Sequence, residues 1–77
     1  MPLLEYGKYI LISRPLHDAQ LGGWVPHASI TWPQKNESHY HEVNVERIFE
    51  TEAGALRFGF NAARAWIDEN LVTQEAT

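Results

Sequence analysis

The chain contains no cysteine among its 77 residues. Disulfide bonds and thiolate metal ligands are therefore excluded, and the composition is compatible with a reducing compartment. No segment approaches the roughly 20 consecutive apolar residues that a membrane-spanning helix needs. The segment Met1 to Tyr6 also lacks the basic start and the apolar run of a signal peptide. We expect a cytoplasmic protein that makes no contact with a membrane.

The chain also has no excess of positive charge. Six Lys and Arg residues stand against ten Asp and Glu residues, which gives a formal net charge of −4. The cations are scattered along the chain at Lys8, Arg14, Lys35, Arg47, Arg57 and Arg64. Because contacts to phosphates supply much of the affinity for nucleic acids, this charge distribution counts against DNA or RNA as the partner.

What remains is the composition of a small globular domain, with 44% hydrophobic and 21% charged residues. We expect a single domain over residues 1–71 and a frayed tail over residues 72–77, where no apolar stripe continues. A core of this size supplies little net stability, so domains of this length often depend on a covalent cross-link, a bound metal or a partner protein.

The last third of the chain predicts one helix, from Thr51 to about Leu71. Apolar residues, most of them large, recur at helical spacing at Leu56, Phe60, Ala63, Ile67 and Leu71. Small residues form a second stripe beside them at Ala55, Gly59 and Ala62. Thr51 is placed to act as the N-cap, and Glu52 puts a negative charge in the first turn. The two stripes predict a helix that packs closely on a sheet.

Three strands are expected before this helix. Aromatic and β-branched residues predict the first strand over Glu5 to Ser13, and strict alternation predicts the third over His39 to Phe49. The second strand, Trp24 to Trp32, contains Pro26, which cannot donate a hydrogen bond to the ladder. We expect a bulge at this proline.

Such a bulge adds one residue and shifts the alternation of the strand. It would place Val25 on the same face as Ile30 and Trp32. The residues between the first two strands, Leu16 to Gly22, are expected to form a flexible connection.

The predicted fold class is α+β, with a three-stranded antiparallel meander packed on one C-terminal helix in the order β-β-β-α. One helix covers only one face of a sheet, so apolar side chains are expected on the other face and on the outer side of the helix. These candidate interface residues are Tyr9, Leu11, Tyr40, Ile48 and Phe58. Contiguous apolar surface on a small domain favours a protein-association module, whose partner is another protein or a second copy in a homodimer.

The sequence indicates a metal site less strongly than it indicates an association surface. His39 and His41 share a strand face and could approach a metal ion, with His27 or Glu42 as a further ligand. This set is short of a closed site, so we expect no metal and no cofactor. A His-based metal-binding protein stays open as an alternative.

No group of residues has the pattern of a catalytic site. The pair His17 and Asp18 lacks a nucleophile, and no glycine-rich phosphate loop precedes a helix. We therefore expect that the protein is not an enzyme and that it has no catalytic residues.

Four short motifs resemble those of a family of short bacterial proteins of unknown function. They lie at Tyr6–Tyr9, Trp24–Pro26, Phe49–Thr51 and Ala63–Asp68. The resemblance covers most of the chain between Tyr6 and Leu71, although Gly7 and Lys8 stand in exchanged order in the first motif.

The resemblance implies a fold similar to the double-stranded-RNA-binding class without its leading helix, and to half of a small antitoxin domain. Binding of RNA in that manner would need a basic cluster at the start of the helix, where this chain has Glu50, Glu52 and Ala53. A small nucleic-acid-binding or antitoxin-like regulatory module is therefore kept as the alternative function.

Overall fold

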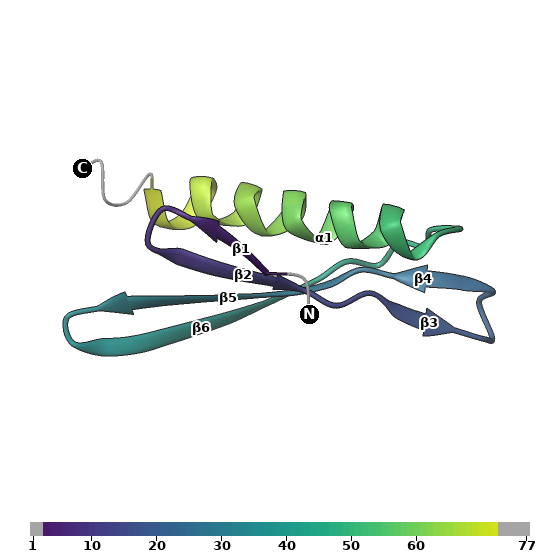
Figure 1. Cartoon of the computed structure of the whole chain (residues 1–77), viewed down its shortest axis with the longest axis horizontal. Coiled ribbons are helices and arrows are strands. Elements are labelled where there is room, and N and C mark those ends of the chain that lie inside the picture. Colours follow the sequence, from purple (N-terminus) through teal and green to yellow (C-terminus); the bar gives the residue numbers. More distant parts are fainter. Residues whose placement is uncertain (1–2, 73–77) are drawn as a thin grey trace.

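The protein is a two-layer α+β domain in which one helix lies along one face of an antiparallel sheet (Figure 1). A computed structural model describes residues 3–72, so the tail expected to be frayed lies outside the described residues except for Val72, which ends a helical turn. The strands are β1 (Leu3–Tyr6), β2 (Tyr9–Ser13), β3 (Leu16–Asp18), β4 (Gly23–Val25), β5 (His27–Gln34) and β6 (Glu37–Asn44). Helix α1 spans Glu52–Ile67 and continues as a π-helical turn over Asp68–Val72.

The expected three-stranded meander is wrong. Four strands form the main sheet in the order β1-β2-β5-β6, and β3 and β4 form a separate two-stranded sheet. Every pairing is antiparallel. The α+β class of the fold is confirmed.

The first expected strand is in fact a hairpin of β1 and β2. Tyr6 pairs with Tyr9, so Gly7 and Lys8 alone make the turn. Gly7 has a φ of 62°, a conformation that glycine adopts without the steric cost of a side chain. A positive φ at the first of two turn residues matches the right-handed twist of the strands, as in a type II′ turn.

The expected bulge at Pro26 is also wrong. Ser13 pairs with Ala28 on one side of the proline, and Leu16 pairs with Val25 on the other. Two residues separate these pairs on each strand. Neither strand therefore has the extra residue of a bulge, and the register is unbroken. The same register sets Pro15 opposite Pro26. Because neither proline has an N–H group, the ladder is interrupted there without a shift.

The unshifted register reverses the predicted side of Val25. Val25 alternates with Pro26, so it lies on the face opposite to Ile30 and Trp32. β5 and β4 therefore read as one interrupted strand, and the expected flexible connection contains β3.

The third expected strand ends earlier than its alternation indicates. β6 stops at Asn44, and Phe49 makes only an isolated bridge to Trp24. The turn before β6 consists of Lys35 and Asn36, with φ values of 51° and 66°. Two consecutive positive φ values are the pattern of a type I′ turn.

Helix α1 begins as the sequence predicts. Thr51 adopts an extended conformation, and its hydroxyl accepts a hydrogen bond from the Gly54 backbone N–H at 3.1 Å. The buried positions of the helix are mostly small ones, Ala55, Gly59, Ala63 and Ile67. Small side chains let the helix axis approach the sheet closely, as the two-stripe pattern predicts.

The core lies between α1 and the face of the sheet beneath it. Its buried apolar residues come mainly from β2, β5 and α1, and they are Tyr9, Leu11, Ala28, Ile30, Trp32, Ala63 and Ile67. Ser13 is the buried polar residue in this layer, and its hydroxyl donates to the Leu56 carbonyl at 2.9 Å. This bond ties the end of β2 to the first half of the helix.

Candidate functional site

The sheet face opposite to α1 carries no helix over it among the described residues, and we call it the open face (Figure 1). Alternation and register place alternate residues of each strand there. The open face comprises Leu3, Glu5, Ile10, Ile12, Arg14, His27, Ser29, Thr31, Pro33, Ser38, Tyr40, Glu42 and Asn44. Half of a small sheet is thus available for contact with another molecule.

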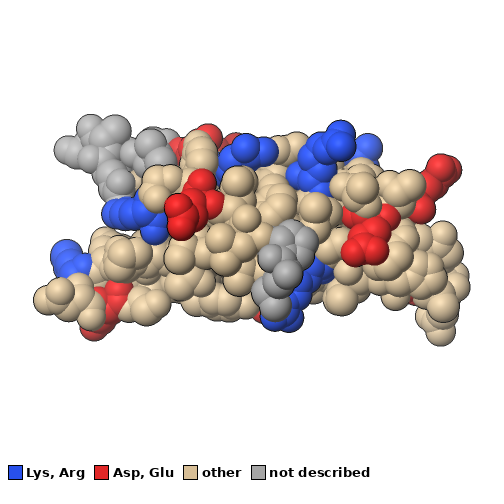
Figure 2. All heavy atoms as spheres, viewed as in Figure 1, with Lys and Arg blue, Asp and Glu red and all other residues tan. Residues whose placement is uncertain are grey.

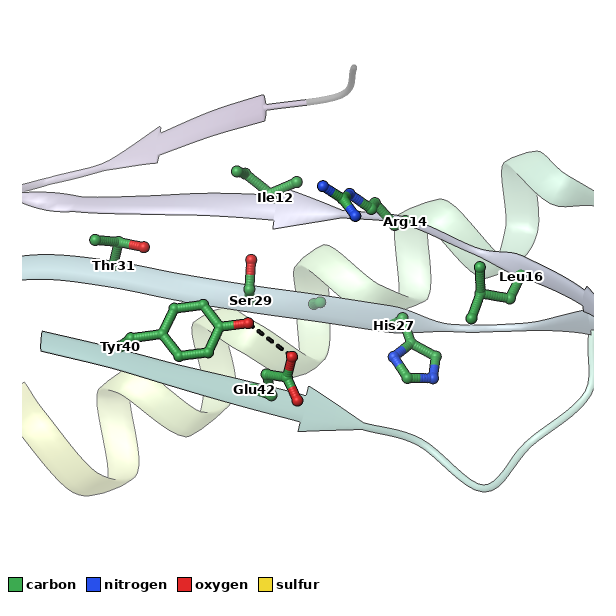
Figure 3. A pocket seen from close by; sticks show the side chains of 9 residues that line it. Ile12, Arg14, Leu16, His27, Ser29, Thr31, Tyr40 and Glu42 are labelled. Carbon is green, nitrogen blue, oxygen red and sulfur yellow. Dashed lines mark hydrogen bonds between the residues drawn. The ribbon is translucent and has the colours of Figure 1, made fainter.

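A shallow hollow of about 310 Å³ lies at the centre of the open face. The small residues Ser29 and Thr31 of β5 form its floor, and larger side chains on the neighbouring strands form its walls (Figure 3). Ile12 stands on the β2 side and Tyr40 on the β6 side. The hollow therefore follows from a strand of short side chains between two strands of longer ones.

Charged groups flank this hollow. The Tyr40 hydroxyl donates a hydrogen bond to Glu42 Oε1 at 2.7 Å (Figure 3). This hydrogen bond to a carboxylate raises the pKa of Tyr40, and the positive charge of Arg14 opposes the shift. The rim thus combines a cation, an anion and a phenol around a floor of hydroxyl groups.

The hollow continues toward the β3–β4 hairpin. His27 lines it and also lines two further hollows beside the hairpin, so the three share one residue. Leu16 lies between the first and third hollows, whereas Leu21 and Ile48 line the second. The open face and the hairpin therefore offer one connected surface.

Two of the five predicted interface residues are misplaced. Tyr9 and Leu11 lie in the core under α1, with exposed fractions of 5% and 0%. Both faces of β2 are apolar, and the helix covers the face of these two residues. Their neighbour Ile10, exposed at 41%, occupies the open face instead.

Tyr40 and Ile48 are exposed, at 60% and 46% respectively. Tyr40 lies on the open face, and Ile48 lies in the loop after β6 beside the second hollow. The structure brings them to the same side of the molecule, at opposite ends of the connected surface.

Phe58 is half-buried within its own chain. Its ring centroid lies 5.1 Å from that of Phe49, and the Arg47 guanidinium lies 5.1 Å from the centroid of Phe58. The loop between β6 and α1 thus covers part of this ring. Phe58 lies away from the open face and holds the loop to the helix.

His39 and His41 share a strand face, as predicted, but each imidazole contacts an indole ring. His41 stacks on Trp66 with ring centroids 3.8 Å apart, and His39 stacks on Trp32 at 5.6 Å. Within residues 3–72, no group of three or more His, Asp or Glu side chains is placed to hold a metal ion. The arrangement joins β6 to the C-terminal half of α1.

The pair His17 and Asp18 shapes the β3–β4 hairpin. Asp18 Oδ1 accepts hydrogen bonds from the backbone N–H groups of Gln20 and Leu21, at 2.9 and 3.0 Å. The His17 ring meets Trp24 edge-on at 5.0 Å. Both side chains are therefore engaged in the turn and the strand pair.

Sequence reasoning missed several residues of the connected surface. Leu3, Ile10, Leu16 and Leu21 are exposed at 41–57%. Alternation within β2 separates Ile10 and Ile12 from Tyr9 and Leu11, and this signal was available. Which of the two sets the helix covers depends on the strand order of the whole sheet.

Charge is mixed over the molecular surface in view. Figure 2 shows acidic and basic side chains interspersed among other residues. In the described part of the chain, no helix has both the length and the apolar character required to cross a membrane.

Comparison with known proteins gives a family and nothing more specific. No curated protein and no solved structure shows significant similarity to the chain. The family model described as "Domain of unknown function (DUF6566)" matches residues 3–77, which is nearly the whole sequence. The chain therefore belongs to the DUF6566 family.

Proposed function

We propose that the protein is a non-catalytic association module that binds another protein through its open face. One observation carries this proposal. Large apolar side chains are exposed at six described positions, and all six lie on the open face or beside the hollows that continue from it. They are Leu3, Ile10, Leu16, Leu21, Tyr40 and Ile48.

The chemistry of the surface favours a folded protein as the partner. Burial of apolar side chains is the main favourable term in protein association, and polar groups at the rim fix the orientation. The central hollow has room for a protruding side chain, and its rim offers Arg14, Tyr40 and Glu42 as hydrogen-bond partners. A partner that combines an apolar anchor with groups of both charges would fit best.

Nucleic acid is less well supported as the partner. Arg14 is the one Lys or Arg residue among those we place on the open face, and Glu5 and Glu42 lie on the same face. A surface that binds phosphates needs several cations to displace counterions. The antitoxin-like or RNA-binding alternative therefore lacks an electrostatic basis on this side of the molecule.

A pair of matched variants tests the proposal. Ile10→Lys places a charge in the middle of the open face, whereas Ala65→Lys adds the same charge to an exposed position on α1. Each tagged variant and the wild type would be cross-linked in the native cell, and captured proteins would be identified by mass spectrometry. Binding of the captured protein to each purified variant would then be measured by calorimetry.

We expect wild type and Ala65→Lys to bind the same protein equally, and Ile10→Lys to bind it at least about tenfold more weakly. Equal binding by all three proteins would show that the open face is not the contact surface. Recovery of nucleic acid in place of a protein, with affinity that falls steeply with salt, would overturn the proposal.

A further inference from the structure

β6 is a long edge strand with little protection against pairing. It spans eight residues, contains neither proline nor lysine, and pairs with β5 without a bulge. In Figure 1, β5 runs along one side of β6, and the other side is the margin of the molecule. Natural sheets usually blunt such edges with lysine, proline, bulges or a covering segment. The other edge strand, β1, has only four residues.

The turn before β6 determines which backbone groups point outward. Gln34 and Glu37 flank the two-residue turn, so this pair exchanges both of its backbone hydrogen bonds. Hydrogen-bonded and non-bonded pairs alternate along an antiparallel ladder. The N–H and C=O groups that point away from β5 are therefore those of Ser38, Tyr40, Glu42 and Asn44.

We propose that two copies of the chain pair through β6, antiparallel, with His41 facing His41 of the second copy across a twofold axis. In this register Tyr40 lies opposite Glu42, and Ser38 lies opposite Asn44. All four outward residues of each copy then find hydrogen-bonded partners. An axis centred on Tyr40 would span the same number of residues of β6, but it would leave the outward groups of Asn44 without a partner in the strand.

Charge and side-chain chemistry support this register over its neighbours. A shift that centres the axis on Glu42 would set two carboxylates directly opposite each other, which is destabilising. With the axis at His41, each Glu42 instead lies opposite a Tyr40 hydroxyl. The same two groups already bond to each other within one strand at 2.7 Å. On the helix side, two His41 rings, each stacked on its own Trp66, flank the axis.

The pairing would join two four-stranded sheets into one of eight strands, with both helices on the same side. The two open faces would then form one continuous surface. The contact is mostly backbone and therefore small, so we expect dimers that dissociate on dilution. This inference does not depend on the proposed function, because Ile10 lies two strands away from the free edge of β6.

Single cysteines test the register directly, since the chain has none of its own. Opposed residues of a non-hydrogen-bonded antiparallel pair have Cα atoms about 4.5 Å apart, within the range of a disulfide. His41→Cys should therefore cross-link rapidly into a dimer under mild oxidation. Asn44→Cys is the control, because the two Asn44 positions would lie six residues apart along the paired strands. Rapid linkage of Tyr40→Cys instead would overturn the His41 register.

A proline pair tests the edge contact without changing His41. Glu42→Pro removes an outward N–H and leaves the pairing with β5 intact. Glu5→Pro is the matched control, since the Gly7–Lys8 turn directs the Glu5 N–H away from β2. In sedimentation experiments, Glu42→Pro should raise the dissociation constant of the dimer by at least about tenfold, and Glu5→Pro should leave it unchanged. A wild-type protein that stays monomeric up to millimolar concentration would overturn the inference.

Discussion

Replacing Gly59 with alanine tests how closely α1 approaches β2. A Cβ atom at this position would lie 2.5 Å from Ser13 Oγ, but 3.5 Å from Ser13 Cβ and 3.7 Å from Ala28 Cβ. Only the hydroxyl is in severe overlap, and it is held in place by its bond to the Leu56 carbonyl. The overlap therefore arises from one atom of one side chain.

Two opposing free energies decide the outcome. Alanine in a helix interior is more stable than glycine by about 0.5–1 kcal/mol. Overpacking of a tight core costs about 1–3 kcal/mol. We expect Gly59→Ala to lower the free energy of unfolding by about 1 kcal/mol, because the steric cost exceeds the gain in helix propensity.

Ser13→Ala removes the overlapping atom and should reverse the sign. Alone, this change should cost about 1 kcal/mol through the lost hydrogen bond. In that background the nearest neighbours are at ordinary contact distance, so Gly59→Ala should stabilise the protein by about 0.5–1 kcal/mol. Urea unfolding of the four proteins, with unchanged m-values, measures the cycle. If Gly59→Ala stabilised the protein in both backgrounds, the close approach of helix and strand would be refuted. Destabilisation in both backgrounds would show that the Ser13 hydroxyl is not the main obstacle to the added methyl group.

Three further predictions concern local contacts. Thr51→Ala removes the N-cap bond to Gly54 and should cost about 1 kcal/mol in urea unfolding, whereas Thr51→Ser should cost little. The Tyr6 hydroxyl donates to Asp68 Oδ1 at 2.8 Å, and this bond raises the pKa of Tyr6. Its contribution to stability should be present at neutral pH and be lost as the pH rises from about 10 through the raised pKa of folded Tyr6, so the difference in urea midpoint between wild type and Tyr6→Phe should narrow progressively above pH 10. Phe58→Ala should cost about 1–3 kcal/mol in thermal unfolding, because the ring packs on the loop before α1, and a loss below that range would show that the ring is not needed to hold the loop.

The helix could be predicted because its signals are local. Thr51 caps the first turn, and the buried residues of the helix come from both predicted stripes: Ala55 and Gly59 from the small one, and Ala63 and Ile67 from the large one. Each signal depends on residues within a few turns of one another. The close packing could be predicted for the same reason, since small side chains on one side of a helix allow a sheet to approach its axis closely.

The strand boundaries could not be predicted equally well, because they depend on pairing partners far along the chain. The run from Leu3 to Ser13 is rich in apolar and aromatic residues on both sides of Gly7, so it resembles one strand in sequence. Only the pairing of Tyr6 with Tyr9 shows that it folds back on itself. In the same way, Pro26 alone predicts a bulge, and only the register that sets Pro15 opposite it shows that the ladder is interrupted without one.

For the candidate site, the most consequential wrong prediction concerns which face of the sheet the helix covers. In β2, Tyr9 and Leu11 alternate with Ile10 and Ile12, and both sets are apolar. Alternation establishes which residues share a face, but hydrophobicity alone does not decide which face meets the helix. That choice depends on the whole sheet, where β5 presents Ala28, Ile30 and Trp32 on one side and short polar side chains on the other.

The facing prolines at positions 15 and 26 interrupt one ribbon, so we expect the parts on either side to open separately. The hairpin of β3 and β4 has its own backbone bonds and a bridge from Trp24 to Phe49, and the gap in the ladder means that it can open without breaking the bonds of β2 and β5. Amide hydrogens within the hairpin should accordingly exchange with solvent much sooner than those of Leu11 and Ile30. The part of the connected surface around Leu16 and Leu21 is then adjustable in shape, while the sheet beside it keeps a fixed form.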